Sequence, residues 1–133
     1  MWAKGLGIMA EANAILTAAL PRRVLIVEDE VLIAMVLEDI LDMLGHVVVR
    51  TAGSYADADI AIAEGGFDLA VLDVNLGQQP VYPLADRLKA AGTDIIFATG
   101  SHPDSLPERF RADAVLEKPY AFQAVETALA RLS

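Results

Sequence analysis

Polar side chains that could perform chemistry follow several short apolar runs of this 133-residue chain. Glu28 and Asp29 come after one run, and Asp73 comes directly after another, Leu69-Ala70-Val71-Leu72. Thr99 and Lys118 end two later runs. Fully apolar runs are typical of strands in a parallel sheet, and the carboxyl ends of such strands share one edge where ligands bind. We therefore expect these acids, this hydroxyl and this amine to lie together at that edge.

A cluster of Glu28, Asp29 and Asp73 would need either a raised pKa or a bound cation. Two carboxylates about 4 Å apart repel each other by roughly 4 kcal/mol at an effective dielectric constant near 20, so either a pKa rises or a cation binds. Hard carboxylate oxygens suit Mg²⁺, and Asp73 beside a metal could act as a nucleophile toward a phosphoryl group. The alternative is structural, since Asp29 or Glu30 could simply cap a helix that begins near Val31.

Composition limits the class of protein. The length suits one domain, and 55% hydrophobic residues exclude a disordered chain. A net charge of −9 disfavours direct binding to nucleic acid, and the absence of cysteine excludes a disulfide scaffold or a thiolate metal site. No apolar run is long enough to span a membrane, and Glu11 interrupts the apolar N-terminus, which fits a secretory signal poorly. We expect a cytoplasmic protein without a membrane partner.

Residues 1–21 form a separate N-terminal extension, in which Ala10 to Leu20 favour a helix that Pro21 ends. Residues 22–133 form the domain. Strands alternate there with helices, which predicts an α/β fold with right-handed crossovers and helices on both faces of a parallel sheet. Pro103 and Pro107 argue against a long helix over 101–111. The expected strands are 24–27, 47–49, 69–72, 95–98 and 114–116, and the expected helices are 31–44 (ended by Gly45), 54–64 (capped by Ser54), 83–90 and 121–132.

The chain from about residue 23 to 132 resembles the receiver domain of bacterial two-component response regulators. The resemblance rests on Glu28-Asp29-Glu30, Leu72-Asp73-Val74-Asn75-Leu76, Thr99 and Lys118-Pro119, which occur in the family's order. It implies a flavodoxin-like (βα)5 three-layer sandwich with sheet order 2-1-3-4-5. Phe97-Ala98-Thr99-Gly100 further resembles a receiver subgroup with a Phe-Ala-Thr-Gly motif, common in single-domain regulators of alphaproteobacteria.

The resemblance also implies a role for each site residue. Three residues would act on the phosphoryl group: Asp73 as the phosphoacceptor, Thr99 as the switch hydroxyl and Lys118 as the phosphate-pairing amine. Four would hold Mg²⁺: Asp29 and Asp73 directly, Asn75 through its backbone carbonyl and Glu28 through water. The Lys118-Pro119 bond is compatible with a cis peptide that aims the lysine inward.

The resulting interpretation is a phosphoacceptor that catalyses only its own phosphotransfer and dephosphorylation. A sensor histidine kinase or a histidine phosphotransfer protein would donate the phosphoryl group. The chain shows no output domain before it ends at Ser133, so we expect signalling through protein contacts, with a homodimer possible. Two alternatives stay open: a small phosphohydrolase, which would usually carry a second Asp where Asn75 stands, and a pseudo-receiver that works without phosphorylation.

The structural change that follows phosphorylation is expected to differ from the change usual in receiver domains. In typical receivers a Tyr or Phe lies three residues before the lysine, but here that position is Val115, which has no ring to turn inward. We therefore expect residues 101–112 to be mobile until Asp73 is phosphorylated.

Overall fold

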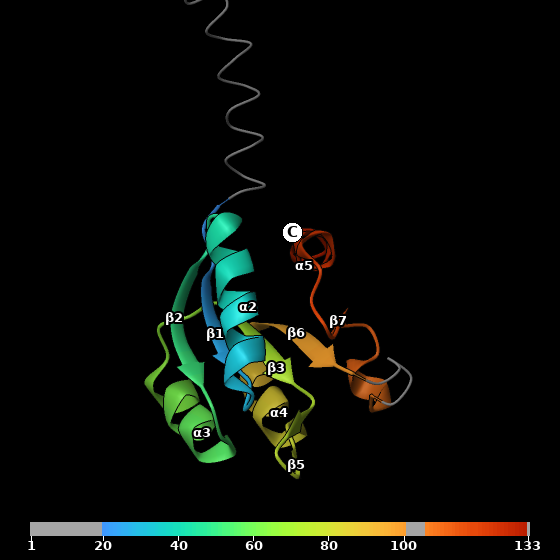
Figure 1. Ribbon diagram of the computed structural model, residues 1–133. Helices are drawn as coiled ribbons and strands as arrows, with labels where there is room; N and C mark the ends of the chain where they lie inside the picture. The colour runs from blue at the N-terminus through green and yellow to red at the C-terminus, as the bar shows by residue number, and fades with distance from the viewer. Residues whose placement is uncertain (1–19, 101–105, 133) are drawn as a thin grey trace, which may run out of the picture.

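The computed structural model describes residues 20–100 and 106–132. In these residues a parallel five-stranded sheet has the order β2-β1-β3-β6-β7 (Figure 1). Numbered within the sheet alone, this order is 2-1-3-4-5, so the predicted flavodoxin-like architecture is confirmed. The strands are β1 (Arg23–Val27), β2 (Val47–Ala52), β3 (Leu69–Asp73), β6 (Asp94–Thr99) and β7 (Ala114–Glu117).

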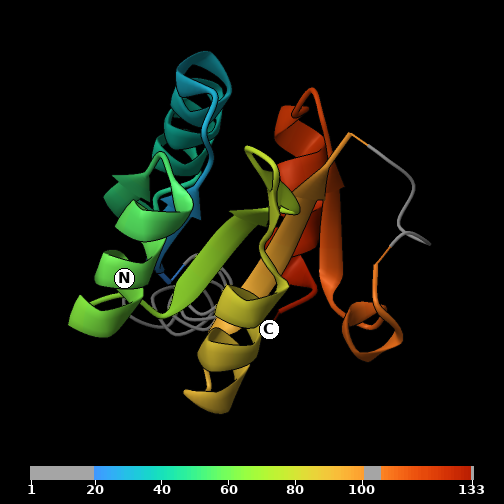
Figure 2. The same ribbon diagram turned by 90° about the horizontal axis from the view of Figure 1, so that it is seen from below.

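Helices cover both faces of the sheet (Figure 2). Leu25 and Val27 of β1 pack in one core with α3 and α4, whereas Val24 and Ile26 pack in a second core with α2 and α5. This alternation is the period of two of a strand, and all four residues are buried because both faces are covered. The helices are α2 (Val31–Met43), α3 (Tyr55–Glu64), α4 (Tyr82–Ala90) and α5 (Phe122–Ala130).

Two predicted helix ends are confirmed. The Ser54 hydroxyl accepts a hydrogen bond from the backbone N–H of Asp57 at 3.1 Å and caps α3. After α2, Gly45 has a φ of +88°, and the N–H groups of Gly45 and His46 return to the carbonyls of Asp42 and Leu41. This is the Schellman arrangement, in which glycine allows the left-handed conformation without steric cost.

Other elements differ from the sequence prediction. Several helices and strands begin or end one to three residues away from the predicted boundaries. For the helices this is the ordinary uncertainty of a frayed end. A short antiparallel hairpin after Asp73, β4 (Asn75–Leu76) with β5 (Gln79–Pro80), was not predicted because two-residue strands show no alternation. The crossover from β6 to β7 carries the 3-10 turn η2 (Glu108–Phe110), so no long helix forms in its described part. Residues 10–19 of the predicted helix over 10–20 lie outside the described residues, and Leu20 lies in neither a helix nor a strand.

None of the helices in the described residues is long and apolar enough to cross a membrane.

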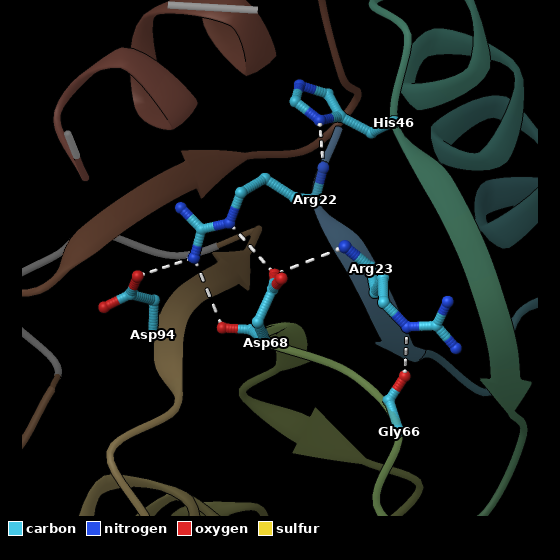
Figure 3. Close-up of polar contacts among 6 residues, drawn as sticks. All are labelled: Arg22, Arg23, His46, Gly66, Asp68 and Asp94. Atoms are coloured by element: carbon cyan, nitrogen blue, oxygen red, sulfur yellow. Dashed lines mark hydrogen bonds and ion pairs between the residues drawn. The ribbon is translucent and has the colours of Figure 1, made fainter. Parts of the chain in front are cut away.

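The amino edge of the sheet, opposite the acidic residues, is tied together by Arg22 (Figure 3). Its guanidinium binds the carboxylate of Asp68 at 2.9 Å and the carboxylate of Asp94 at 2.6 Å. Asp68 directly precedes β3, and Asp94 is the first residue of β6. Its backbone N–H donates to Nδ1 of His46 at 2.9 Å, and its carbonyl accepts from Val47 of β2. Burial, followed by the Arg22 charge, lowers the pKa of His46, which keeps the ring neutral and able to accept. One residue therefore joins the ends of four strands.

We expect Arg22→Lys to destabilise the domain by about 1 to 2 kcal/mol. Lysine keeps the charge but cannot hold two carboxylates with a planar fork. Urea unfolding followed by circular dichroism would measure the loss. Arg50→Lys is the matched control, because Arg50 makes one exposed ion pair with Glu64 and should change stability by less than about 0.5 kcal/mol. Equal losses in both variants would show that the fork does not matter.

Candidate functional site

Three carboxylates converge at the carboxyl edge of the sheet. Glu28 and Asp29 follow β1, and Asp73 ends β3, which is the neighbour of β1 and pairs Leu72 with Val27. One oxygen from each carboxylate lies within 4.8 Å of the others. Glu28 and Asp73 are buried, whereas Asp29 faces the solvent. The predicted acidic cluster therefore forms, with one acid open to an incoming group.

Lys118 supplies the positive charge of this cluster. Its ammonium nitrogen lies 2.6 Å from Oε1 of Glu28 and 3.0 Å from Oδ2 of Asp73. The residue follows β7, and its backbone N–H donates to the carbonyl of Thr99 at the end of β6. The Lys118–Pro119 peptide bond is cis. Residues from three distant parts of the sequence thus meet in one ion-paired group.

Backbone amides from the segment after Asp73 orient two of the carboxylates. The N–H of Asn75 donates to Oδ1 of Asp73 at 3.2 Å. Gly77, which turns the chain between β4 and β5 with a φ of +63°, donates its N–H to Oδ2 of Asp29 at 3.0 Å. Asp73 therefore has one oxygen on an amide and the other on an ammonium, which fixes the orientation of its carboxylate.

The acids after β1 do not cap the helix that follows them. Glu30 is the N-cap residue of α2, but its side chain makes no capping hydrogen bond. Asp29 is bonded to Gly77 instead, and Glu28 accepts from the N–H of Glu30 through Oε2. These acids are organised around one another and Lys118 rather than around the start of the helix.

Burial and nearby charges shift the pKa values of Glu28, Lys118 and Tyr120. Burial raises the pKa of Glu28 to about 7, with Lys118 opposing the rise and Asp73 adding to it. Burial alone would lower the pKa of Lys118, but Glu28 and Asp73 outweigh it, so the net shift is upward. Burial also raises the pKa of Tyr120, and the charges of Glu28 and Asp73 raise it further. Burial and the charge of Asp73 therefore both oppose ionisation of Glu28, while Lys118 favours it.

The remaining predicted residues lie around this group. Thr99 is buried as the last residue of β6, where its carbonyl contacts Lys118. Asn75 is exposed at the start of β4. The roles assigned to the Thr99 hydroxyl and the Asn75 carbonyl stay predictions. The contact of the Gly77 amide with Asp29 was not predicted, and its only signal in the sequence is a glycine four residues after Asp73.

Aromatic rings connect the helix after this site with the β6–β7 crossover. Tyr82 of α4 stacks on Phe110 with ring centroids 5.7 Å apart, and Phe97 of β6 contacts both rings. Residues 101–112 were predicted to be mobile, but Leu106 and Phe110 within this segment are fully buried. Buried side chains of this kind favour an ordered segment around them. Residues 101–105 of that segment lie outside the described residues.

Comparison with known proteins agrees with this geometry. The sequence model of the response regulator receiver domain matches residues 24–130. The solved structure of SdrG from Sphingomonas melonis Fr1 is 44% identical, covers 85% of this chain and 98% of its own, and superimposes with a TM-score of 0.76. A second structure of SdrG, in a BeF3-activated conformation, is 45% identical, covers 83% of this chain and 94% of its own, and has a TM-score of 0.72.

Two curated relatives are longer proteins. The transcriptional regulatory protein PdtaR of Mycobacterium tuberculosis is 35% identical over 123 residues, which are 86% of this chain and 60% of PdtaR. The phyllosphere-induced regulator PhyR of Methylorubrum extorquens is 34% identical over 106 residues, which are 77% of this chain and 38% of PhyR. The chain therefore spans less than two thirds of the length of either relative.

Proposed function

The chain belongs to the family of response regulator receiver domains, and from this we propose that it is a phosphoacceptor that receives a phosphoryl group on Asp73. The observation that carries the proposal is the setting of the Asp73 carboxylate. It is oriented by the Asn75 amide and paired with Lys118 at 3.0 Å, beside two further acids. The BeF3-activated conformation of SdrG supports the proposal by similarity.

The donor would be a phosphorylated histidine of a sensor kinase or phosphotransfer protein. An oxygen of Asp73 attacks phosphorus, a P–O bond forms and the P–N bond to the imidazole breaks. The imidazole takes up a proton as it leaves, and the product is an acyl phosphate. Lys118 neutralises charge on the phosphoryl oxygens during transfer. Asn75 keeps the Asp73 oxygen oriented, and Thr99 would donate its hydroxyl to the product.

The residues present fit Mg²⁺. Every candidate donor is a hard oxygen, and Lys118 alone leaves three clustered carboxylates under-neutralised. Asp29 and Asp73 would bind the ion directly, the Asn75 carbonyl would add a ligand, and Glu28 would act through water. When bound, the ion would offset the charge of the incoming phosphoryl group. The exposed Asp29 leaves the site open to a hydrated ion.

The first test is chemical labelling. The protein incubated with radiolabelled acetyl phosphate should acquire an acid-labile label that requires Mg²⁺. Failure to label with acetyl phosphate, phosphoramidate or any other phosphodonor would instead favour a pseudo-receiver. Steady turnover of a phosphate ester would favour a phosphohydrolase, although Asn75 stands where such an enzyme usually has an acid.

We expect Asp29→Asn to weaken Mg²⁺ binding by tenfold or more, which corresponds to at least about 1.4 kcal/mol. The amide oxygen can still accept from Gly77, so the loop should keep its position while one anionic ligand is lost. Isothermal titration with MgCl₂ measures the affinity. Asp42→Asn, an exposed acid of α2, is the control and should bind like the parent. If Asp29→Asn binds Mg²⁺ as tightly as the parent, the ion sits elsewhere.

A further inference from the structure

The hairpin of β4 and β5 has an anchored base and an exposed turn. Leu76 of β4 and Val81, which directly follows β5, are buried in the core that α3 and α4 cover. The N–H of Val81 donates to the carbonyl of Val74 at 3.1 Å and closes the base. Gly77 and Gln78 form the exposed turn. The anchored base therefore holds the backbone amides of the hairpin in place at the sheet edge.

The hairpin donates one amide to each of the two acids proposed to bind the ion directly. The N–H of Asn75 donates to Oδ1 of Asp73 at 3.2 Å, and the N–H of Gly77 donates to Oδ2 of Asp29 at 3.0 Å. Asp73 ends β3, whereas Asp29 lies between β1 and α2. One short hairpin thus bridges two carboxylates from separate segments and occupies one oxygen of each.

Mg²⁺ and Ca²⁺ use carboxylates differently. Mg²⁺ requires near-octahedral geometry with oxygens at about 2.0 to 2.1 Å and keeps several waters. Ca²⁺ accepts six to eight oxygens at about 2.3 to 2.6 Å in flexible geometry, and it can take both oxygens of one carboxylate. An amide N–H on one oxygen opposes such bidentate binding, because the positive end of the N–H dipole and the cation repel each other when both face that oxygen. A carboxylate held by an amide therefore suits an ion that takes one oxygen.

We propose that Gly77 is a positioning residue that makes the site prefer Mg²⁺ over Ca²⁺, because its amide holds Asp29 for coordination through one oxygen. The inference rests on the proposed function, since it concerns the ion of the phosphoacceptor site. Asp73 is also held by Lys118 at 3.0 Å, whereas Asp29 is exposed and is oriented by the Gly77 amide. The coordination of Asp29 is therefore the part of the site that depends most on the turn.

The turn conformation needs glycine, which makes the inference testable. Gly77 has a φ of +63°, and a Cβ added there would meet no atom within 4 Å. A substitution therefore strains the backbone without a steric clash. A β-branched valine strongly disfavours positive φ, whereas asparagine adopts it far more readily. Gly77→Val should displace the amide, and Gly77→Asn should retain it.

Isothermal titration with MgCl₂ and with CaCl₂ measures the preference. The parent protein should bind Mg²⁺ more tightly than Ca²⁺. Gly77→Val should bind Mg²⁺ about tenfold more weakly without a matching loss for Ca²⁺, because loss of a group that orients a ligand costs metal affinity. Gly77→Asn should keep the preference of the parent.

Gly45→Val is the matched control. Gly45 also has a positive φ, +88°, and free space for a Cβ, but it lies after the end of α2 remote from Asp29. It should lower the melting temperature and leave the preference unchanged. An unchanged preference in Gly77→Val, or an equal loss in Gly77→Asn or Gly45→Val, would overturn the inference. If the parent binds neither ion, the proposed metal site fails together with it.

Amide exchange in EDTA tests the hydrogen bond without an ion. The Gly77 amide should exchange about tenfold faster in Asp29→Ala than in the parent, because its acceptor is lost. The Asn75 amide donates to Asp73 instead and should keep its rate. An unchanged rate at Gly77 would overturn the inference and would not bear on phosphorylation of Asp73, since neither ion nor phosphodonor is present.

Discussion

Asp73→Asn is expected to abolish phosphorylation while the domain stays folded. The amide is nearly isosteric with the carboxylate and can still accept from the N–H of Asn75, but it is not a nucleophile. It also removes one negative charge from the cluster with Glu28 and Asp29, so the melting temperature should not fall below that of the parent. Acid-labile label from acetyl phosphate with Mg²⁺ should drop to background, and circular dichroism should show an unchanged fold.

Asp42→Asn is the control for this experiment, since Asp42 is exposed on α2 far from the cluster. It should label like the parent protein. Undiminished labelling of Asp73→Asn would place the phosphoacceptor on another residue and overturn the proposed function.

Lys118→Ala should have the largest effect on stability. Lys118 is the cation that contacts both buried acids, and removing one partner of a buried ion pair costs about 3 to 5 kcal/mol. The loss should grow with pH. The pKa of Glu28 is about 7 in the folded state and 4.5 in the unfolded state, so ionisation of Glu28 increasingly opposes folding as the pH rises from 4.5 to 7. Because Lys118 lowers the pKa of Glu28, its removal raises that pKa further, and the loss of stability continues to a higher pH. Urea unfolding in EDTA at pH 6 and pH 8 measures both effects.

A matched control separates burial from the mere presence of an ion pair. Lys89 binds both carboxylate oxygens of Asp113 at 3.0 and 2.8 Å, but its side chain is 43% exposed. Lys89→Ala should therefore cost less than about 1 kcal/mol. If both lysine variants lose the same stability at both pH values, the acidic cluster does not depend on Lys118.

Local rules were sufficient to predict most elements of the fold. Val24 to Val27 and Leu69 to Leu72 are apolar without interruption, which is the pattern of strands covered on both faces. Ser54 and Gly45 mark helix ends by chemistry that acts within a few residues. Because parallel strands share one carboxyl edge, the same pattern also predicted which residues would lie near one another.

The contacts themselves were decided by the tertiary structure. Lys118 lies 90 positions after Glu28, and nothing local specifies that its ammonium reaches both Glu28 and Asp73 across β6. The amide of Gly77 on Asp29 likewise depends on how the β4–β5 turn folds over the sheet edge. Arg22 reaches two acids, Asp68 and Asp94, that become neighbours only when β3 and β6 pair. Periodicity and capping act over a few residues, whereas these contacts arise from strand order and packing, which bring distant residues together.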